Sequence, residues 1–299
     1  MKYFSSFFLL VSLWGTIGSG ENARWSYAGS TGPKSWCDSA KICCGDRQSP
    51  IDLPKTKVNQ VKKLNDLNFE NVPKIMSIEN NGYSVVFTIV DNSKNRPTMS
   101  GGDLGGTYIF DNLHFHWGDK SGQGSEHAIG GKLYSLEAHL VTYNSKFNNL
   151  SHALASNEPR ALAVFAVLFQ EQQPADSNSK SFSQAIANAL PLVKYKGQKS
   201  QSLTSFPMKE ILPSQMDHFY RYEGSLTTPT CNEVVVWTVF DSIGSITQNQ
   251  LQSFGNLQST TKADSKQMPM VNNFRPLQKI NGRKVTYNCG PTGANKCQA

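Results

Sequence analysis

The chain has 299 residues, of which 38% are hydrophobic and 17% charged, and its formal net charge is +7 at pH 7. This composition allows a packed core and excludes wholesale disorder, which requires low hydrophobicity together with a high net charge. The basic residues form no run of five or more, so we expect no nucleic-acid partner.

Residues 1–20 have the pattern of a secretory signal peptide. Lys2 gives a basic start, and an apolar run over residues 7–17 is followed by the small residues 18–20. The run is shorter than the roughly 20 residues that span a bilayer. No later stretch is long and apolar enough to span, and the polar C-terminal end lacks the signal for a glycolipid anchor. We therefore expect the mature chain to be secreted and extracellular, without a membrane anchor.

Two further features suit an oxidising compartment. An even number of cysteines lies outside the signal peptide, which predicts up to three disulfides without fixing their pairing: Cys37, Cys43, Cys44, Cys231, Cys289 and Cys297. A four-cysteine zinc site fits poorly because two C-x-x-C pairs are missing and Cys43 and Cys44 are adjacent. Asn149, followed by Leu150 and Ser151, is an N-glycosylation acceptor in a polar segment.

Five short segments have the composition of β-strands, since they are rich in branched and aromatic residues and most are bounded by Gly, Asn, Asp or Pro. They are residues 83–90, 107–117, 133–143, 161–169 and 233–239. Helical spacing occurs only briefly, over 181–190 and 247–254. No repeat or linker divides the chain, so the sequence predicts a single domain, mainly β with short helices, around a large sheet.

Three of the six histidines form one pattern. His114 and His116 are two apart in a strand-like segment, so both rings point to the same face, about 6–7 Å apart along the chain. His139 lies in the next such segment and completes a set of three if the strands are neighbours. Three neutral imidazoles leave one tetrahedral position on Zn²⁺ for water, whose pKa the metal lowers from about 15.7 to about 7. The pattern predicts a zinc enzyme with a hydroxide nucleophile.

His-x-His alone also occurs as an ordinary pair of strand histidines. A cupin-type site is disfavoured because Lys120 and Ser121 stand where its glutamate is expected. Metal-bound histidines need an acceptor for the second ring nitrogen. Glu137 and Asn112 each precede a histidine of the set by two residues and therefore share its strand face. A solvated glutamate remains the alternative for Glu137.

Several segments occur in an order and spacing typical of one enzyme family. They are Leu113-His114-Phe115-His116-Trp117-Gly118, Gly122-Gln123-Gly124-Ser125-Glu126-His127, Glu137-Ala138-His139-Leu140-Val141, Arg47-Gln48-Ser49-Pro50-Ile51, Asn80-Asn81-Gly82, Tyr222 with residues 224–229, Trp237, Asn273, and Arg275-Pro276. Together they resemble the α-class carbonic anhydrases of the secreted type, and they run through nearly the whole mature chain.

The resemblance implies a mixed, mostly antiparallel twisted sheet of about ten strands and the reversible hydration of CO2 to bicarbonate and a proton. It implies Zn²⁺ as cofactor, with His114, His116 and His139 as ligands. Thr227 would accept a hydrogen bond from zinc hydroxide and donate its own proton to Glu126. The backbone N–H of Thr227 would stabilise the developing oxyanion.

Other residues take roles from the same resemblance. An apolar wall that accepts CO2 would comprise Val141, Val164, Leu226, Val235 and Trp237, with Thr228 as a further substrate contact. Simple core packing is the alternative for the wall. Supporting contacts behind the zinc ligands would come from Asn112, Glu137, His127, Tyr222 and Asn273. The remaining partners would be CO2 and bicarbonate alone, and a monomer is favoured.

One departure concerns proton transfer. Fast members of the family carry a histidine after Asn-Asn-Gly, where this chain has Tyr83. A phenol with a pKa near 10 is poorly matched to a donor near 7, whereas an imidazole at about 6.5 is well matched. We expect turnover at low buffer concentration to be limited by proton transfer.

The resemblance also bears on disulfides and boundaries. In secreted and membrane-attached relatives, a cysteine before Arg-Gln-Ser-Pro pairs with one after Thr-Thr-Pro, which favours Cys43–Cys231, with Cys44 as an alternative to Cys43. Cys37–Cys44 and Cys289–Cys297 would remain. The catalytic domain is assigned to residues 21–280, and residues 281–299 to a disulfide-tied tail. A binding module without catalysis is the competing class, but its usual mark, a missing zinc histidine, is not found here.

Overall fold

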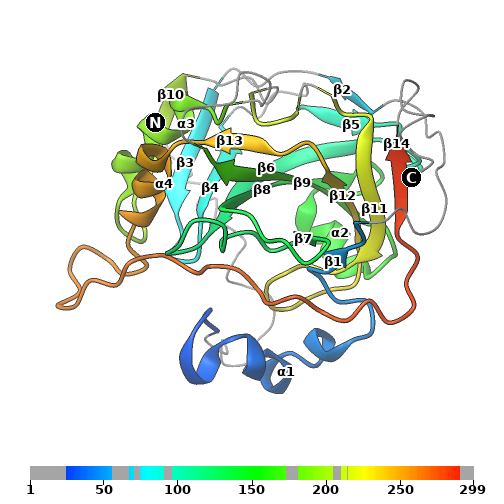
Figure 1. Cartoon of the computed structure of the whole chain (residues 1–299), viewed down its shortest axis with the longest axis horizontal. Helices are drawn as coiled ribbons and strands as arrows, with labels where there is room; N and C mark the ends of the chain where they lie inside the picture. The colour runs from blue at the N-terminus through cyan, green and yellow to red at the C-terminus, as the bar shows by residue number, and fades with distance from the viewer. Residues whose placement is uncertain are drawn as a thin grey trace, which may run out of the picture.

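A large mixed sheet forms the body of the molecule (Figure 1). The computed structural model describes residues 25–55, 67–70, 75–90, 96–172, 181–204, 210–213 and 215–289. Twelve strands belong to the main sheet, which runs β10-β3-β4-β6-β8-β9-β12-β11-β14, with β5 also paired to β6, β2 to β5 and β13 to β9. Among the strands described, β9 pairs in parallel with β12 and with β13, and the other pairs of this sheet are antiparallel.

The strands are β1 (Asp52–Leu53), β2 (Asn68–Glu70), β3 (Ile75–Asn80), β4 (Val85–Ile89), β5 (Thr98–Ser100), β6 (Tyr108–Trp117), β7 (Ala128–Ile129), β8 (Leu136–Asn144), β9 (Leu162–Glu171), β10 (Lys199–Thr204), β11 (His218–Gly224), β12 (Val235–Phe240), β13 (Gly244–Ile246) and β14 (Thr286–Cys289). β1 and β7 form a separate parallel pair. The predicted class, mainly β around a large mixed sheet, is confirmed, with twelve strands in the sheet rather than about ten.

The helices are short, and two of them pack on central strands of the sheet: α2 on β8 and β9, and α4 on β6 through Phe254. The α-helices are α1 (Trp36–Ser39), α2 (Leu150–Ser156), α3 (Gln184–Ala189) and α4 (Gln248–Gly255), and the 3₁₀ helices are η1 (Gly29–Thr31), η2 (Pro33–Ser35), η3 (Lys41–Cys44) and η4 (Leu190–Val193). Both helical segments predicted from the sequence are confirmed, as α3 and α4. Pro191 lies in η4, directly after α3, where its missing N–H is tolerated at a helix start. α4 begins with a capping box between Thr247 and Gln250.

The central strands are buried on both faces, and the sheet separates one apolar cluster on each face. Along β8, Leu136, Ala138 and Leu140 belong to the larger cluster on one face. Val141 and Tyr143 belong to a second cluster on the opposite face, because side chains alternate along a strand. The histidine-bearing positions of β6 and β8 share the face of the second cluster. The site therefore lies on one defined side of the sheet.

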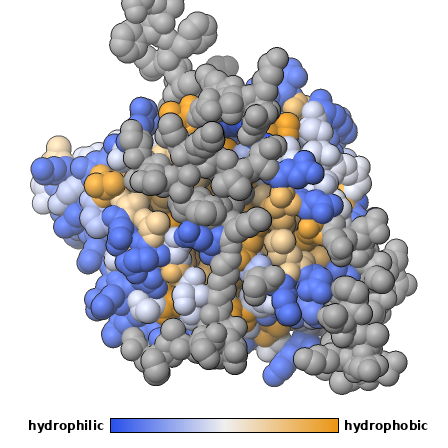
Figure 2. Space-filling model, turned by 90° about the horizontal axis from the view of Figure 1, so that it is seen from above, coloured by the Kyte–Doolittle hydropathy of each residue, from blue (hydrophilic) through white to orange (hydrophobic). Residues whose placement is uncertain are grey.

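Seen from above, the surface carries hydrophilic side chains around its periphery and apolar ones toward the middle (Figure 2). The large hydrophobic side chains found exposed in the described part of the chain are Ile42, Val90, Leu192, Met268, Leu277 and Ile280. Single exposed apolar residues of this kind are normal on a protein surface. Within the described ranges, no helix is long and apolar enough to cross a membrane.

In the described part of the chain, one disulfide ties the N-terminal segment to the body and a second closes a short loop within that segment. Cys43 is bonded to Cys231 across 188 residues, with a Cα–Cα distance of 4.9 Å, and Cys37 is bonded to Cys44 with a Cα–Cα distance of 5.3 Å. Cys297, the partner predicted for Cys289, lies outside the described residues, as does the predicted signal peptide. Thr286–Cys289 forms β14 beside β11, so part of the segment assigned to a tail is a strand of the sheet.

Candidate metal centre and active site

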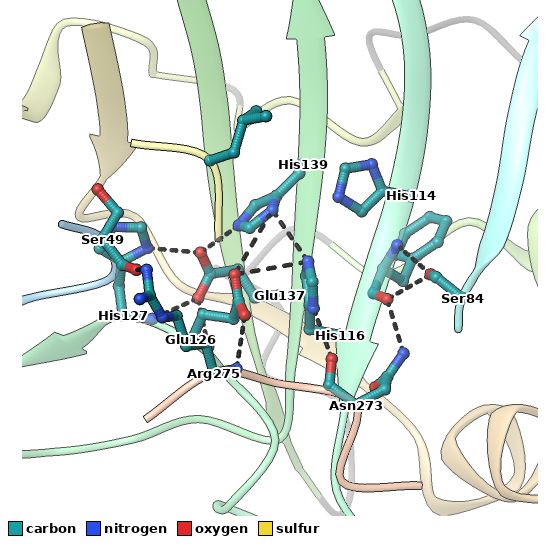
Figure 3. A network of polar contacts seen from close by, with 12 residues as sticks. Ser49, Ser84, His114, His116, Glu126, His127, Glu137, His139, Asn273 and Arg275 are labelled. Carbon is teal, nitrogen blue, oxygen red and sulfur yellow. Dashed lines mark hydrogen bonds and ion pairs between the residues drawn. The ribbon is translucent and has the colours of Figure 1, made fainter. Parts of the chain in front are cut away.

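Three histidine side chains meet on one face of the sheet (Figure 3). His114 and His116 lie on β6, and the strand register places His114 directly opposite His139 on β8. The ring centroid of His114 lies 5.2 Å from that of His116 and 5.2 Å from that of His139, and the centroids of His116 and His139 lie 4.5 Å apart. Each ring offers a nitrogen within 4.8 Å of the others, and all three side chains are buried. The neighbouring strands thus bring together the set expected from the sequence.

The first two rings are held by acceptors behind them. Nδ1 of His114 lies 2.9 Å from Oδ1 of Asn112, which is the neighbour predicted from strand alternation. Nδ1 of His116 lies 2.7 Å from the backbone carbonyl oxygen of Asn273. The Asn273 side chain also accepts from the Trp117 N–H at 2.8 Å and donates to the Tyr83 carbonyl at 2.9 Å. Asn273 therefore fixes both a candidate ligand and the segment that carries Tyr83.

Glu137 is the centre of the polar network. Its Oε1 lies 2.6 Å from Nε2 of His139 and 2.7 Å from Nδ1 of His127, while Oε2 accepts the backbone N–H groups of Glu126 and His127, both at 2.8 Å. Burial alone would raise its pKa, but His127 and His139 outweigh burial and hold the pKa well below its ordinary value. Since Glu137 is 0% exposed, the alternative of a solvated strand glutamate is wrong. Its ionised carboxylate orients His139.

The network continues away from the histidine cluster. Nε2 of His127 lies 2.7 Å from the Tyr222 hydroxyl, which donates to the Ser49 hydroxyl at 2.9 Å. The Tyr222 ring is stacked parallel to that of Trp237, with an interplanar angle of 7°. His127 and Tyr222 are thus brought together as expected, and they link the site to the Arg47–Ile51 segment.

Glu126 presents a buried carboxylate to the histidine cluster. Its Oε1 accepts the backbone N–H of Arg275 at 2.8 Å. Its Oε2 lies 3.6 Å from Nε2 of His116 and 4.0 Å from Nδ1 of His139. The pKa of Glu126 is raised to about 7, mainly by burial and also by the charge of Glu137. Three groups act to lower this pKa: His139, the nearby Thr227 side chain and the Arg275 N–H. Thr227 is buried, and its side chain is close enough to the Glu126 carboxylate, the group predicted to accept its proton, to lower the pKa of that carboxyl.

Arg275 supports the site although no role for it is predicted from the sequence. It is 3% exposed, and its Nη1 donates to Gln48 Oε1 at 2.8 Å and to the Ser49 carbonyl at 2.9 Å, while Nη2 donates to the Cys43 carbonyl at 3.0 Å. Its backbone holds Glu126, so Arg275 couples the site to the N-terminal segment. The Arg275-Pro276 pair in the family motif was the signal that could have identified it.

The residues predicted as an apolar wall pack in one cluster on the same face as the histidines. The cluster contains Val141, Val164, Val235 and Trp237, with Leu226 packed against it. The Trp237 ring lies 4.9 Å from the His139 ring, and its Nε1 donates to the Ser225 carbonyl at 3.1 Å. Thr228 is 5% exposed. An apolar surface therefore adjoins the histidine cluster.

Tyr83 lies against an aromatic residue of the N-terminal segment. Its ring stacks on that of Trp25, with centroids 4.1 Å apart and an interplanar angle of 18°. The Lys196 ammonium lies 5.9 Å from the Tyr83 ring centroid, and the backbone N–H of Tyr83 donates to Asn81 Oδ1 at 2.8 Å. Both the backbone and the ring of Tyr83 are thus held in place.

Comparisons with known proteins point to the same chemistry as this donor set. The family of eukaryotic-type carbonic anhydrases matches residues 31–289. The chain is 37% identical over 263 residues to carbonic anhydrase 7 of Mus musculus, covering 87% of this chain and 96% of that protein. It is 36% identical over 269 residues to carbonic anhydrase 12 of Homo sapiens, covering 88% and 72%, and 34% identical over 266 residues to carbonic anhydrase 1 of Mus musculus, covering 88% and 98%.

The donor chemistry fits the metal that this family uses. Three imidazoles, each able to present one nitrogen to a common point, suit the three-ligand catalytic sites of Zn²⁺. A second group, His127, Glu137 and His139, also has donor atoms within 4.8 Å of one another, but its atoms already bond to each other in the network behind the cluster. With the fold, the histidine cluster and the extent of the sequence match in agreement, the chain belongs to the eukaryotic-type carbonic anhydrase family of zinc-dependent enzymes.

Proposed function

We propose that this chain is a secreted enzyme that catalyses the reversible hydration of CO2 to bicarbonate and a proton, with Zn²⁺ held by His114, His116 and His139. The observation that carries the proposal is the convergence of these three rings while an acceptor holds the second nitrogen of each. When bound, Zn²⁺ would act as a Lewis acid that lowers the pKa of water to about 7. The ligand atoms would be Nε2 of His114, Nε2 of His116 and Nδ1 of His139.

Thr227 and Glu126 would orient the attacking water. A hydroxyl that donates its proton to a buried carboxylate can only accept from the nucleophile, and this directs an oxygen lone pair toward the carbon of CO2. Glu126 is fixed for this role by the Arg275 N–H and by its place beside the cluster. The backbone N–H of Thr227 would stabilise the negative charge that develops on the substrate oxygen.

Substrate binding would use the apolar wall and Thr228. CO2 is small and apolar, so weak binding requires only a dry surface beside the nucleophile. Val141, Val164 and Trp237 support this role because they pack together next to His139. Packing and substrate binding are compatible, since both require these side chains to be buried and apolar.

Tyr83 would make proton release slow. Its position corresponds to the proton-transferring histidine of fast relatives, and a phenol is a poor carrier for a proton from a donor near pKa 7. The stack on Trp25 supports this proposal because it holds the Tyr83 ring in place, whereas a side chain that carries protons to solvent needs to move. CO2 hydration itself would persist, and regeneration of the nucleophile would depend on buffer.

The proposal of secretion is based on the signal-peptide pattern of residues 1–20. The two disulfides support it because disulfides persist in an oxidising compartment. Asn149 is exposed, and its Oδ1 accepts the His152 N–H at 2.9 Å as the cap of α2, which leaves Nδ2 as the atom for a glycan. Expression in a eukaryotic secretory host should yield the protein in the medium with a mass that falls after glycosidase treatment. Retention in the cell would contradict the assignment.

The function is tested by stopped-flow CO2 hydration on purified protein whose zinc content is measured, with and without an aromatic sulfonamide. We expect one equivalent of zinc and inhibitable hydration, and we expect both to be lost together in His114→Ala. A matched control is His152→Ala, an exposed histidine whose side chain lies outside the cluster. A folded protein with no zinc and no hydration would favour a binding module that has lost catalysis.

A further inference from the structure

A buried arginine and threonine lie on the face of the sheet opposite the histidine cluster. Arg221 on β11 is directly opposite Thr238 on β12, and residues that face each other in an antiparallel pair project to the same side. Their neighbours in the strands, Phe219 and Val236, belong to the larger apolar cluster, whereas Tyr222 and Trp237 face the histidine side. These two polar groups are therefore separate from the active site.

Neither side chain has a hydrogen-bond partner in the described part of the chain. Arg221 is 6% exposed, and its Nε, Nη1 and Nη2 are all buried without a partner. Thr238 is 0% exposed, and its Oγ1 is likewise without one. Buried polar groups in proteins are nearly always hydrogen-bonded, and an exception calls for a specific explanation. Two orphaned groups side by side point to a shared partner.

The charge of Arg221 is poorly balanced by the protein. Burial lowers its pKa to about 10, and Arg160 lowers it further, while Asp103 and Tyr108 act in the opposite direction. A pKa of about 10 still leaves the guanidinium charged at neutral pH. Asp103 is exposed, and Glu223 on the same strand is already paired with Arg160 at 2.9 Å. Burying a charge without a partner is costly, so the site requires a negative group.

The groups around the Arg221 guanidinium approach it closely, which limits any ligand there to a small one. The guanidinium carbon lies 5.1 Å from the Phe219 ring centroid, so this ring covers part of it. A Cβ placed on Gly102 would lie 3.2 Å from Nη2 of Arg221 and 2.8 Å from a Leu67 methyl carbon, so the backbone at this glycine approaches the charge closely. On the other side of Arg221, Thr286 of β14 is opposite it in register and only partly buried. The row Thr286, Arg221, Thr238 thus leads from partial exposure into the core.

We propose that Arg221 and Thr238 bind a small monovalent anion, such as a halide or bicarbonate, at a site distinct from the histidine cluster. The guanidinium offers up to five N–H donors in a planar fork, and the threonine hydroxyl offers one more. Such charge-assisted contacts are the strong ones in proteins, and a planar oxoanion can take two of them at once. The anion supplies the charge that Asp103 only partly provides.

Crystallography with bromide gives a direct test. Crystals of the zinc-loaded protein grown or soaked in sodium bromide should show an anomalous peak within hydrogen-bond distance of Arg221 and of Thr238 Oγ1. Crystals of Arg221→Leu should lack this peak while retaining any other bromide peaks. Density for water alone at this place in the wild-type crystals, with bromide bound only elsewhere, would overturn the proposal.

A solution measurement separates this site from the metal centre. Thermal unfolding is followed against bromide concentration at constant ionic strength, with gluconate as the balancing anion and a saturating aromatic sulfonamide at the metal centre. The apparent bromide dissociation constant should rise by about tenfold or more in Arg221→Leu and by about threefold to tenfold in Thr238→Val. Lys279→Gln, which removes an exposed positive charge, is the matched control and should leave the response unchanged.

The two variants keep the test decisive. Thr238→Val preserves shape and charge, so it reports on the hydroxyl even if Arg221→Leu folds poorly. An equal bromide response in the wild type, Thr238→Val and Lys279→Gln would show that the response is a general salt effect and would contradict an anion held by Arg221 and Thr238.

Discussion

At the scale of single residues, one carboxylate fixes much of the active site. Glu137 accepts two backbone N–H groups and contacts two histidine rings within a fully buried space. Glutamine at this position keeps the shape but replaces one acceptor oxygen with an NH₂ group that would face an N–H donor. The contacts of Glu137 therefore depend on its charge and not only on its size.

We expect Glu137→Gln to weaken zinc binding by about 10–100-fold, the usual cost of losing a residue that orients a metal-bound histidine. The unfolding free energy should fall by about 2–3 kcal/mol because donors are left unsatisfied in the core. Zinc affinity is measured by competition with a chelator, and stability by urea unfolding. Glu158→Gln is the control, because its exposed pair with Lys146 contributes at most about 1 kcal/mol. Equal effects in the two variants would contradict the role of Glu137.

Tyr83 is a second position where one side chain sets a property of the enzyme. We expect Tyr83→His to raise CO2 hydration at low buffer concentration by about tenfold or more, since an imidazole pKa matches the donor. Exogenous imidazole should accelerate the wild type and should affect the variant much less. The measurement is stopped-flow hydration at increasing buffer concentration, and Tyr83→Phe is the control for loss of the hydroxyl alone. No response to either the substitution or imidazole would show that proton transfer is not limiting.

At the scale of secondary-structure elements, strand register places the chemistry. The pairing of His114 with His139 and of His116 with Glu137 fixes which rings and carboxylates are neighbours. A slip of one residue would move every side chain of a strand to the other face of the sheet. The register shift between Phe110 and Asn112 lies just before the histidines and sets their phase relative to the start of β6.

Helix α4 packs behind this arrangement and offers a test that leaves the chemistry intact. Thr247 accepts the Gln250 N–H, and the Gln250 side chain accepts the Thr247 N–H. We expect Thr247→Ala to lower the unfolding free energy by about 1 kcal/mol through loss of the cap, whereas Thr247→Ser should change it little. Urea unfolding measures both variants. Hydration activity should be unchanged, because α4 contributes Phe254 to the cluster on the far face.

At the scale of the whole molecule, the long disulfide joins the N-terminal segment to the loop that carries Thr227. Cys231 lies four residues after Thr227, and its N–H donates to the Thr228 carbonyl at 2.8 Å. Its partner Cys43 accepts from Arg275 through the backbone carbonyl. Three segments that are distant in sequence are thus tied together beside the active site.

Removal of this bridge should be more costly than removal of the short one. The Cys43→Ser/Cys231→Ser double variant opens a loop of 188 residues, which the chain-entropy model values at about 5 kcal/mol. Cys37→Ser/Cys44→Ser opens a separation of 7 residues, valued at about 2–3 kcal/mol. Denaturant unfolding of both variants against the wild type gives the comparison. Equal losses would contradict an entropic origin for the difference.

Much of the sheet could be predicted from local patterns, and the exceptions have a physical cause. The central strands β4, β6, β8, β9 and β12 are rich in branched and aromatic residues and were recognised. β10 at the sheet edge reads Lys-Ser-Gln-Ser-Leu-Thr, and such a polar sequence gives no strand signal. It is a strand because it pairs with β3, a contact made over a long sequence separation. β11, the strand that carries Arg221, is a second strand outside the five predicted segments.

The sequence by itself determined the family, through the order and spacing of its motifs. It also determined that His114 and His116 share a strand face and that Asn112 and Glu137 each share the face of a histidine two residues on, since these depend on alternation within one strand. Only the tertiary structure decided that the Asn273 carbonyl holds His116, that Arg275 fixes Glu126, and that Arg221 and Thr238 are buried together without partners. These contacts join residues far apart in the chain. Local periodicity carries no information about such pairs, because the packing of the whole sheet selects them.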